Sequence, residues 1–133
     1  MADLYIGLMS GTSLDGVDGV LVDLSKDRLK VISHVNAPLS LALTQELLAL
    51  NTPGANEIHR SALAANALVR VYAHIVAQLL HKTGLNAAQV TAVGAHGQTV
   101  RHQPQAYDGT GYTLQLNNPA LLAELTCIDV VAD

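Results

Sequence analysis

The sequence predicts a single α/β domain in which helices cover a mixed β-sheet. Half of its 133 residues are hydrophobic and 14% are charged, a composition typical of a chain that folds around a buried core. Three short apolar segments follow one another near the start of the chain, and the later ones are separated by segments with helical periodicity. Strands that follow each other directly pair antiparallel, whereas strands separated by helices pair in parallel or return across the sheet, so this order predicts a mixed sheet.

The first three strands are expected at residues 4–9, 19–24 and 29–36. The second is enriched in valine, a β-branched residue that favours strands. A polar, glycine-rich bend separates the first strand from the second, and a charged turn at residues 25–28 separates the second from the third. Short connections of this kind predict an antiparallel meander.

Two helices are expected after Pro38. Leucines recur through residues 41–50, and Asn51-Thr-Pro-Gly54 ends this short helix. A longer helix is expected over residues 57–83, with Gly84 as its C-cap. Its apolar residues recur with helical spacing opposite a polar stripe, which predicts one buried and one solvated face. The polar stripe consists of Asn66, Arg70, His74, Gln78 and Lys82.

The remaining chain predicts further strands and one more helix, which begins at Pro119, a residue suited to a first helical turn. The complete order fits a ribonuclease-H-like domain, one lobe of the fold shared by actin, sugar kinases and the heat-shock ATPases. This fit rests on topology alone. The expected segments are a strand at 90–95, a turn-rich stretch at 103–111, an alternating segment at 112–117, the helix to 126 and a last strand at 128–132.

Composition argues against several kinds of partner. The formal net charge of −4 provides no basic face for a phosphodiester backbone, so no nucleic acid partner is expected. Asp3 stands where a signal peptide carries lysine or arginine, and no uninterrupted apolar run approaches membrane-spanning length, which predicts a cytoplasmic protein without a membrane partner. The single cysteine, Cys127, excludes a disulfide within the chain and is expected to be buried. Because Phe and Trp are absent, an aliphatic core is expected.

The bend between the first two strands, Met9-Ser-Gly-Thr-Ser-Leu-Asp-Gly-Val-Asp18, has the chemistry of an anion-binding loop. Gly11 and Gly16 permit backbone angles that let consecutive N–H groups converge on an anion. The hydroxyls of Thr12 and Ser13 add two further donors. These groups suit phosphate oxygens.

Two carboxylates, Asp15 and Asp18, accompany these donors. They would repel a bare phosphate, so they fit a site in which a divalent cation, a bound water or a sugar hydroxyl lies between. The alternative interpretation is a plain β-hairpin in which Asp15-Gly16 forms a tight turn and the hydroxyls satisfy backbone groups. The bend lacks the lysine of a P-loop and does not precede a helix, so it is not one.

A second polar cluster, Gly94-Ala-His-Gly-Gln-Thr99, follows the strand expected at 90–95. Its small residues leave the backbone open to a ligand, and His96 and Gln98 supply donors and acceptors. The alternative for His96 is a buried, hydrogen-bonded histidine. A metal site formed by His96 and His102 lacks helical spacing and a third ligand.

Four segments of the chain, in order, together resemble anhydro-N-acetylmuramic acid kinase. The resemblance implies a bacterial enzyme of cell-wall recycling and amino-sugar catabolism with the actin and sugar-kinase fold. Such enzymes use ATP, Mg²⁺ and water to open the 1,6-anhydro ring of anhydro-N-acetylmuramic acid and phosphorylate O6, giving N-acetylmuramic acid 6-phosphate and ADP. The segments are Gly7-Leu-Met-Ser-Gly-Thr-Ser-Leu-Asp-Gly-Val-Asp18, Gly94-Ala-His-Gly-Gln-Thr-Val-Arg-His102, Leu114-Gln-Leu-Asn-Asn118 and Val130-Val-Ala-Asp133.

The resemblance also implies roles for particular residues. Thr12 and Ser13 are implied as phosphate donors, and Asp15 and Asp18 as partners of metal-bound water or sugar hydroxyls, although the Mg²⁺ ligand itself stays open. The segment that faces the anhydro amino sugar is matched by His96, Gln98 and Thr99. The nucleotide loop is matched by Gly11, Thr12, Ser13, Leu14, Asp15, Gly16, Val17 and Asp18.

The sequence departs from the family in length. Residues 1–133 correspond to an N-terminal ribonuclease-H-like lobe, and the family's general-base aspartate is expected beyond residue 133. No catalytic residue is therefore assigned, and the chain alone is expected to be inactive. Two alternatives stay open: another ATPase of the actin-like superfamily, and a non-catalytic interaction module or truncated product. A homodimer is expected through exposed leucine and valine side chains.

Overall fold

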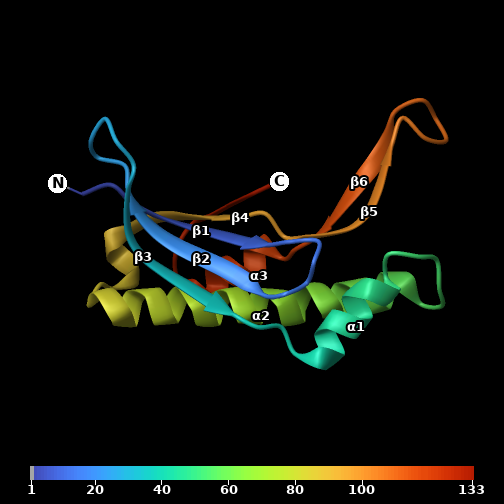
Figure 1. The fold of residues 1–133 in the computed structure, drawn as a ribbon, viewed down its shortest axis with the longest axis horizontal. Coiled ribbons are helices and arrows are strands. Elements are labelled where there is room, and N and C mark those ends of the chain that lie inside the picture. Colours follow the sequence, from blue (N-terminus) through green and yellow to red (C-terminus); the bar gives the residue numbers. More distant parts are fainter. Residues whose placement is uncertain (1) are drawn as a thin grey trace.

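A five-stranded sheet with the order β3-β2-β1-β4-β7 forms the centre of the structure, a computed structural model that describes residues 2–133 (Figure 1). A separate two-stranded sheet consists of β5 and β6. The elements are β1 (Leu4–Ser10), β2 (Val17–Asp23), β3 (Lys30–Ala37), α1 (Leu41–Ala49), α2 (Glu57–Thr83), a 3₁₀ turn (Ala87–Gln89), β4 (Val90–Ala95), β5 (Gln98–Pro104), β6 (Gly111–Leu116), α3 (Pro119–Thr126) and β7 (Val130–Ala132).

The main sheet is mixed, as the sequence predicts. β1, β2 and β3 form an antiparallel meander, while β4 pairs in parallel with β1 on one side and with β7 on the other. The apolar alternation sets the register, because Leu4, Ile6 and Leu8 of β1 are all buried on one face. The mixed sheet and its helices agree with one lobe of the actin-like ATPase fold.

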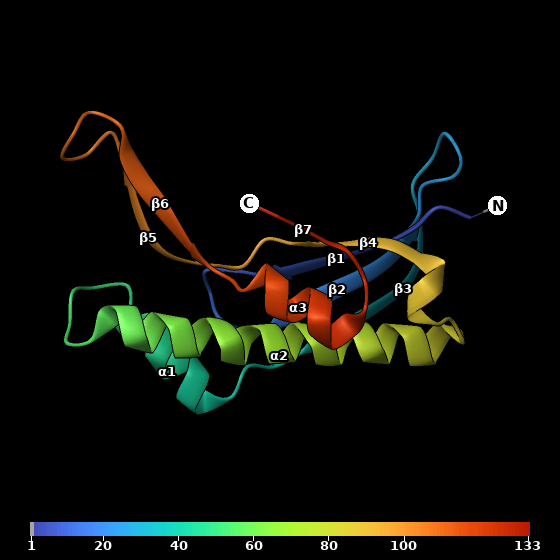
Figure 2. The same ribbon diagram turned by 180° about the vertical axis from the view of Figure 1, so that it is seen from behind.

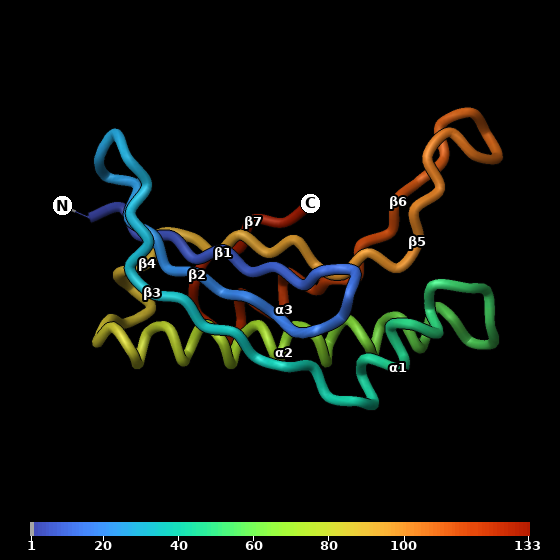
Figure 3. Tube along the Cα trace, viewed as in Figure 1, coloured from blue at the N-terminus to red at the C-terminus, as the bar shows by residue number. Residues whose placement is uncertain are grey.

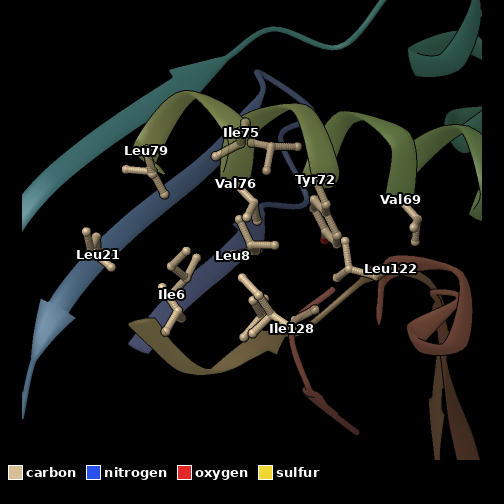
Figure 4. Close-up of a cluster of buried hydrophobic side chains, with 14 of the residues drawn as sticks. Ile6, Leu8, Leu21, Val69, Tyr72, Ile75, Val76, Leu79, Leu122 and Ile128 are labelled. Carbon is tan, nitrogen blue, oxygen red and sulfur yellow. The ribbon is translucent and has the colours of Figure 1, made fainter. Parts of the chain in front are cut away.

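The long helix α2 covers one face of the sheet, and α3 lies on the same side (Figure 2). The observed bounds of α2 match the prediction, and Gly84 ends this helix in the left-handed conformation with φ 68°. The predicted polar stripe stays largely in solvent, with Arg70 and His74 exposed. The opposite face packs on the sheet through residues that include Ile75, Val76 and Leu79 (Figure 4).

By length and hydropathy alone, α2 would also qualify as a membrane-spanning helix. It is the one such helix among residues 2–133. The apolar sequence of α2 is not uninterrupted, because polar residues recur in it at every fourth position from Asn66 to Lys82. Since its apolar face is buried against the sheet, we interpret α2 as the core helix of a globular domain.

The hairpin of β5 and β6 projects away from the main sheet beyond its end (Figure 3). The sequence predicts β6 but not β5, because β5 begins within the polar cluster and carries Arg101 and His102. The hairpin is fixed at its base by Arg101, whose Nε donates to the carbonyl oxygen of Leu50 at 2.9 Å and whose guanidinium pairs with Glu57. A second apolar cluster beneath it joins Val100 and Leu116 to leucines of α1.

Two expectations, that Cys127 is buried and that the core is aliphatic, are wrong. Cys127 is exposed, because it ends α3 with φ 57° and its side chain points away from the core. The core is not purely aliphatic, because Tyr72 of α2 is 0% exposed. Its ring lies beside Leu8 and Leu122 (Figure 4).

Candidate active site

The two polar motifs that the sequence predicts lie side by side at one end of the main sheet. Leu8 of β1 pairs with Ala95 of the parallel strand β4, and the amide of His96 donates to the Leu8 carbonyl oxygen at 3.3 Å. The loop after β1 and the turn after β4 therefore leave the same edge of the sheet, near the base of the β5–β6 hairpin (Figure 3). The carboxyl ends of parallel strands are the usual place for ligands in open α/β sheets.

The β1–β2 loop consists of residues 11–16, because Ser10 and Val17 are the last paired residues of the two strands. It is a hairpin connection, as in the alternative interpretation, but the hydrogen-bonded turn runs from Gly11 to Leu14, whose N–H donates to the Gly11 carbonyl oxygen at 3.1 Å. A tight turn at Asp15-Gly16 is therefore wrong.

The two glycines of this loop differ, because Gly16 has the unusual backbone angle that the sequence predicts, φ 156°, and Gly11 does not. Gly11 does not adopt a left-handed φ, whereas Leu14 does, with φ 58°, an uncommon conformation for a leucine. Burial of the Leu14 side chain against the leucines of α1 holds it there. Gly16 is needed for close approach, because a Cβ at this position would lie 2.6 Å from the Ala37 carbonyl oxygen.

The loop presents polar groups to solvent on its outer side. Gly11, Thr12, Ser13 and Asp15 are exposed, so the corner is open rather than closed by packing. The side chains of Leu14 and Val17 are buried, the Leu14 N–H is used within the loop, and Val17 is paired in the sheet. The exposed part of the loop therefore carries two hydroxyls and one carboxylate.

Asp18, the first polar residue of β2 after this loop, already has partners on β3. Its carboxylate accepts hydrogen bonds from Asn36 Nδ2 at 2.9 Å and from His34 Nε2 at 3.1 Å. These bonds, that of Asn36 first, lower the pKa of Asp18 below its usual value. Asp18 is thus ionised at neutral pH. Within residues 2–133, no three His, Cys, Asp or Glu side chains form a cluster that could hold a metal ion.

The turn between β4 and β5 depends on Gly97. Its φ is 83°, and a Cβ there would lie 2.5 Å from the Leu116 carbonyl oxygen. Asn117 supports the same turn, because its Nδ2 donates to the Ala95 carbonyl oxygen at 3.0 Å. The backbone on both sides of Gly97 is therefore fixed against the end of β6.

Gln115, which the sequence analysis did not select, connects two of the three residues predicted to face the sugar, His96 and Thr99. Gln115 Nε2 lies 3.0 Å from His96 Nδ1, and Gln115 Oε1 accepts from the Thr99 hydroxyl. Thr99 and Gln115 are register partners in the hairpin. Polar and apolar residues alternate over 112–117, which predicts a strand. The sequence does not predict β5, the partner of that strand, so it gives no neighbour for Gln115.

Gln98 differs from its two neighbours because its side chain is only 2% exposed. Its Nε2 donates a long hydrogen bond of 3.4 Å to the Thr99 carbonyl oxygen, and Oε1 has no hydrogen-bond partner within residues 2–133. An unpaired buried acceptor costs free energy, so a donor from a ligand or water would stabilise it. A direct sugar contact by Gln98 stays a prediction.

A hollow of about 390 Å³ adjoins the two motifs on the open face of the sheet. Its floor includes Gly7 and Gly94, which are register partners on β1 and β4 and leave bare backbone there. Asp18 and His96 line it together, so the hollow joins one residue of each predicted motif. His102 lies elsewhere, on the hairpin, where its Nδ1 is 2.7 Å from Thr113 Oγ1.

Comparisons with known proteins show what the chain is similar to. The family model described as anhydro-N-acetylmuramic acid kinase matches residues 3–133.

Three of the curated relatives that carry that same name show how far the similarity extends. The relative from Albidiferax ferrireducens is 77% identical over all of this chain and 34% of its own length. The relative from Variovorax paradoxus is 63% identical over 98% of the chain and 35% of its own length. The relative from Ralstonia nicotianae is 57% identical over the whole chain and 35% of its own length. The chain thus spans about a third of the length of the relatives it matches.

Proposed function

The chain belongs to the anhydro-N-acetylmuramic acid kinase family, and on that premise we propose that it supplies one wall of a kinase site for ATP and 1,6-anhydro-N-acetylmuramic acid. In the proposed reaction water adds to C1 of the sugar, the bond from C1 to O6 breaks, and O6 receives the γ-phosphoryl group of ATP. The products are N-acetylmuramic acid 6-phosphate and ADP. The chain corresponds to the N-terminal lobe in this proposal, and the reaction serves cell-wall recycling.

The convergence of the β1–β2 loop and the β4–β5 turn at one sheet end is the observation that supports this proposal most. Phosphoryl transfer depends on positioning and on electrostatic stabilisation of the transferred group, so the donors for phosphate and for sugar must lie close together. In this proposal the exposed hydroxyls of Thr12 and Ser13 bind phosphate oxygens, together with main-chain N–H groups of the loop other than that of Leu14, which donates to Gly11.

The carboxylates beside the loop fit a magnesium ion in composition. Mg²⁺ prefers oxygen ligands and is commonly bound through one or two carboxylates together with substrate phosphates and water. Asp15, which is exposed, and Asp18, which is ionised, are the residues of this chain that would hold it. Bound there, the ion would neutralise charge on the phosphates, and it would remove the repulsion between these carboxylates and ATP.

The sugar is expected to lie toward His96 and Thr99. Together with Gln115 they form a row of hydrogen-bond donors and acceptors, which suits the hydroxyls of a sugar. The adjoining hollow offers the apolar side chains of Met9 and Val20 for the faces of a sugar ring. Gln98 is proposed to contribute from beneath this row.

We assign no general base within residues 2–133. A base must lie within hydrogen-bond reach of the attacking water, and the carboxylates beside the loop, Asp15 and Asp18, are already proposed to hold the magnesium ion. The chain by itself is therefore proposed to be inactive and to act with a second wall. A cytoplasmic location, where ATP is available, belongs to the same proposal, while a homodimer and the lack of nucleic acid and membrane partners stay predictions.

A hybrid enzyme tests this proposal. In it, the present chain replaces the matching third of the Albidiferax ferrireducens relative, with which it is 77% identical. We expect the hybrid to release ADP only when the anhydro sugar and Mg²⁺ are both present, at a rate comparable to that of the relative itself. The measurement is a coupled ADP assay, with the product identified by mass spectrometry as the sugar 6-phosphate.

The control is the present chain alone, which is expected to give no turnover under the same conditions. A folded hybrid that binds neither ATP nor the anhydro sugar would contradict the proposal and favour a non-catalytic module. ATP hydrolysis that does not depend on the sugar would favour another ATPase of the actin-like superfamily.

A further inference from the structure

A pair of buried hydroxyls lies directly beneath the candidate site. Tyr72 of α2 is 0% exposed and Ser10 at the end of β1 is 4% exposed. Ser10 Oγ lies 3.2 Å from the Tyr72 hydroxyl and donates to the Gly97 carbonyl oxygen, also at 3.2 Å. With the one Ser10 proton used in this way, the Tyr72 hydroxyl is the donor to Ser10.

This hydrogen-bonded chain connects three elements that are far apart in the sequence. Ser10 immediately precedes the β1–β2 loop, and Gly97 stands between His96 and Gln98 in the turn after β4. Tyr72 belongs to the middle of α2, where its ring is held by the apolar core. The core helix thereby fixes the position of the phosphate-facing loop relative to the sugar-facing turn.

The two hydroxyls have little freedom to adopt another arrangement. A buried hydroxyl without a partner costs free energy, so each depends on the other and on Gly97. Burial raises the pKa of Tyr72 above its usual value. The Tyr72 hydroxyl therefore stays protonated and keeps its role as a donor at neutral pH.

We propose that Tyr72 and Ser10 are a positioning pair that sets the separation of the β1–β2 loop from the β4–β5 turn, and with it the alignment of the ATP phosphates with the sugar. Neither residue touches a substrate in this proposal. The inference rests on the proposed function for its effect on catalysis, but the coupling of the loop to the turn is a property of the chain itself and is tested separately.

The first test is hydrogen–deuterium exchange of this chain carrying Tyr72→Phe. The substitution keeps the ring in the core and removes only the hydroxyl, so the fold should persist with a melting temperature lowered by a few degrees. We expect faster exchange in the peptides that cover residues 10–16 and 94–99 together. The matched control is Tyr107→Phe at the hairpin tip, where the side chain is 85% exposed. In this variant the exchange of residues 10–16 and 94–99 should not change.

The second test uses the hybrid enzyme defined above. Tyr72→Phe and Ser10→Ala should each lower kcat by about tenfold with KM for ATP and for the sugar unchanged, because misplacement of bound groups slows the transfer step without removing binding contacts. The double variant should be no slower than the slower single variant if the two residues act as one unit.

The outcomes separate this inference from the proposed function. Unchanged exchange in residues 10–16 and 94–99 of Tyr72→Phe would overturn the inference, whatever the hybrid does. An active hybrid in which Tyr72→Phe changes only thermal stability, with kcat intact, would also overturn it. An inactive hybrid would count against the proposed function alone, and the exchange experiment would still decide whether the pair positions the loop and the turn.

Discussion

Replacing Thr12 and Ser13 together by alanine is expected to lower kcat/KM for ATP of the hybrid enzyme by about 10²- to 10³-fold, the loss typical when donors to a developing negative charge are removed. Both side chains are exposed on the loop and neither is part of the apolar core, so the substitutions should leave the fold intact. The expected loss therefore reports lost contacts with phosphate. It is measured by steady-state kinetics with ATP as the varied substrate.

The matched control is Thr110→Ala, which removes an exposed hydroxyl from the hairpin tip far from the loop. We expect the control to keep the kinetics of the parent hybrid. Thr12→Ser should retain most of the activity, because the hydroxyl remains. Full activity of the double alanine variant would show that the loop hydroxyls do not bind the transferred phosphate.

Replacing Gly97 by alanine should produce a large loss of stability. The position combines φ 83° with a Cβ placed 2.5 Å from the Leu116 carbonyl oxygen, and a main-chain atom of a paired strand cannot move aside easily. Backbone strain of this kind costs about 1–3 kcal/mol, and the displaced β6 adds to it, so we expect the free energy of unfolding to fall by about 3 kcal/mol. Urea unfolding followed by circular dichroism measures it.

Gly94→Ala is the control for this prediction, because a Cβ there meets no atom closer than the Ile6 carbonyl oxygen at 4.0 Å. It has no left-handed φ, and its free energy of unfolding should change by less than about 1 kcal/mol. Equal losses for the two variants would contradict the geometry described for the β4–β5 turn. In the hybrid enzyme Gly97→Ala should also impair catalysis, since Gly97 stands between His96 and Gln98.

The elements with strong local patterns could be predicted from the sequence. α2 has a sustained apolar period and an adjacent glycine at its end, and its observed bounds, Glu57–Thr83, are those expected. The three-stranded meander follows from short connections between apolar runs, and Pro119 begins α3 as expected. In each case local propensity and burial favour the same structure.

β5 could not be predicted because its pattern is not local. The strand carries Gln98, Thr99, Arg101 and His102, and its polar residues are accommodated by partners distant in the chain. Arg101 is satisfied by Leu50 and Glu57, and Thr99 by Gln115. Without that pairing the role of Gln115 beside His96 could not be inferred either.

The site itself was only partly predictable. The chemistry of Thr12, Ser13, Asp15 and His96 is legible from residue type and neighbouring glycines. Their proximity depends on the parallel pairing of β1 with β4, two strands separated by the whole of α1 and α2. The strained Leu14 and the buried Tyr72–Ser10 contact also arise from tertiary packing, which no short sequence pattern reports.

Hydrogen–deuterium exchange of the hybrid enzyme, with and without the anhydro sugar and Mg²⁺ bound to a non-hydrolysable ATP analogue, would locate the ligands on this chain. We predict slower exchange on ligand binding in the peptides that cover residues 7–18 and 94–102, and unchanged exchange at the hairpin tip, residues 105–110. Protection confined to other parts of the chain, with residues 7–18 unaffected in the presence of the bound nucleotide, would contradict the assignment of the β1–β2 loop as the phosphate site.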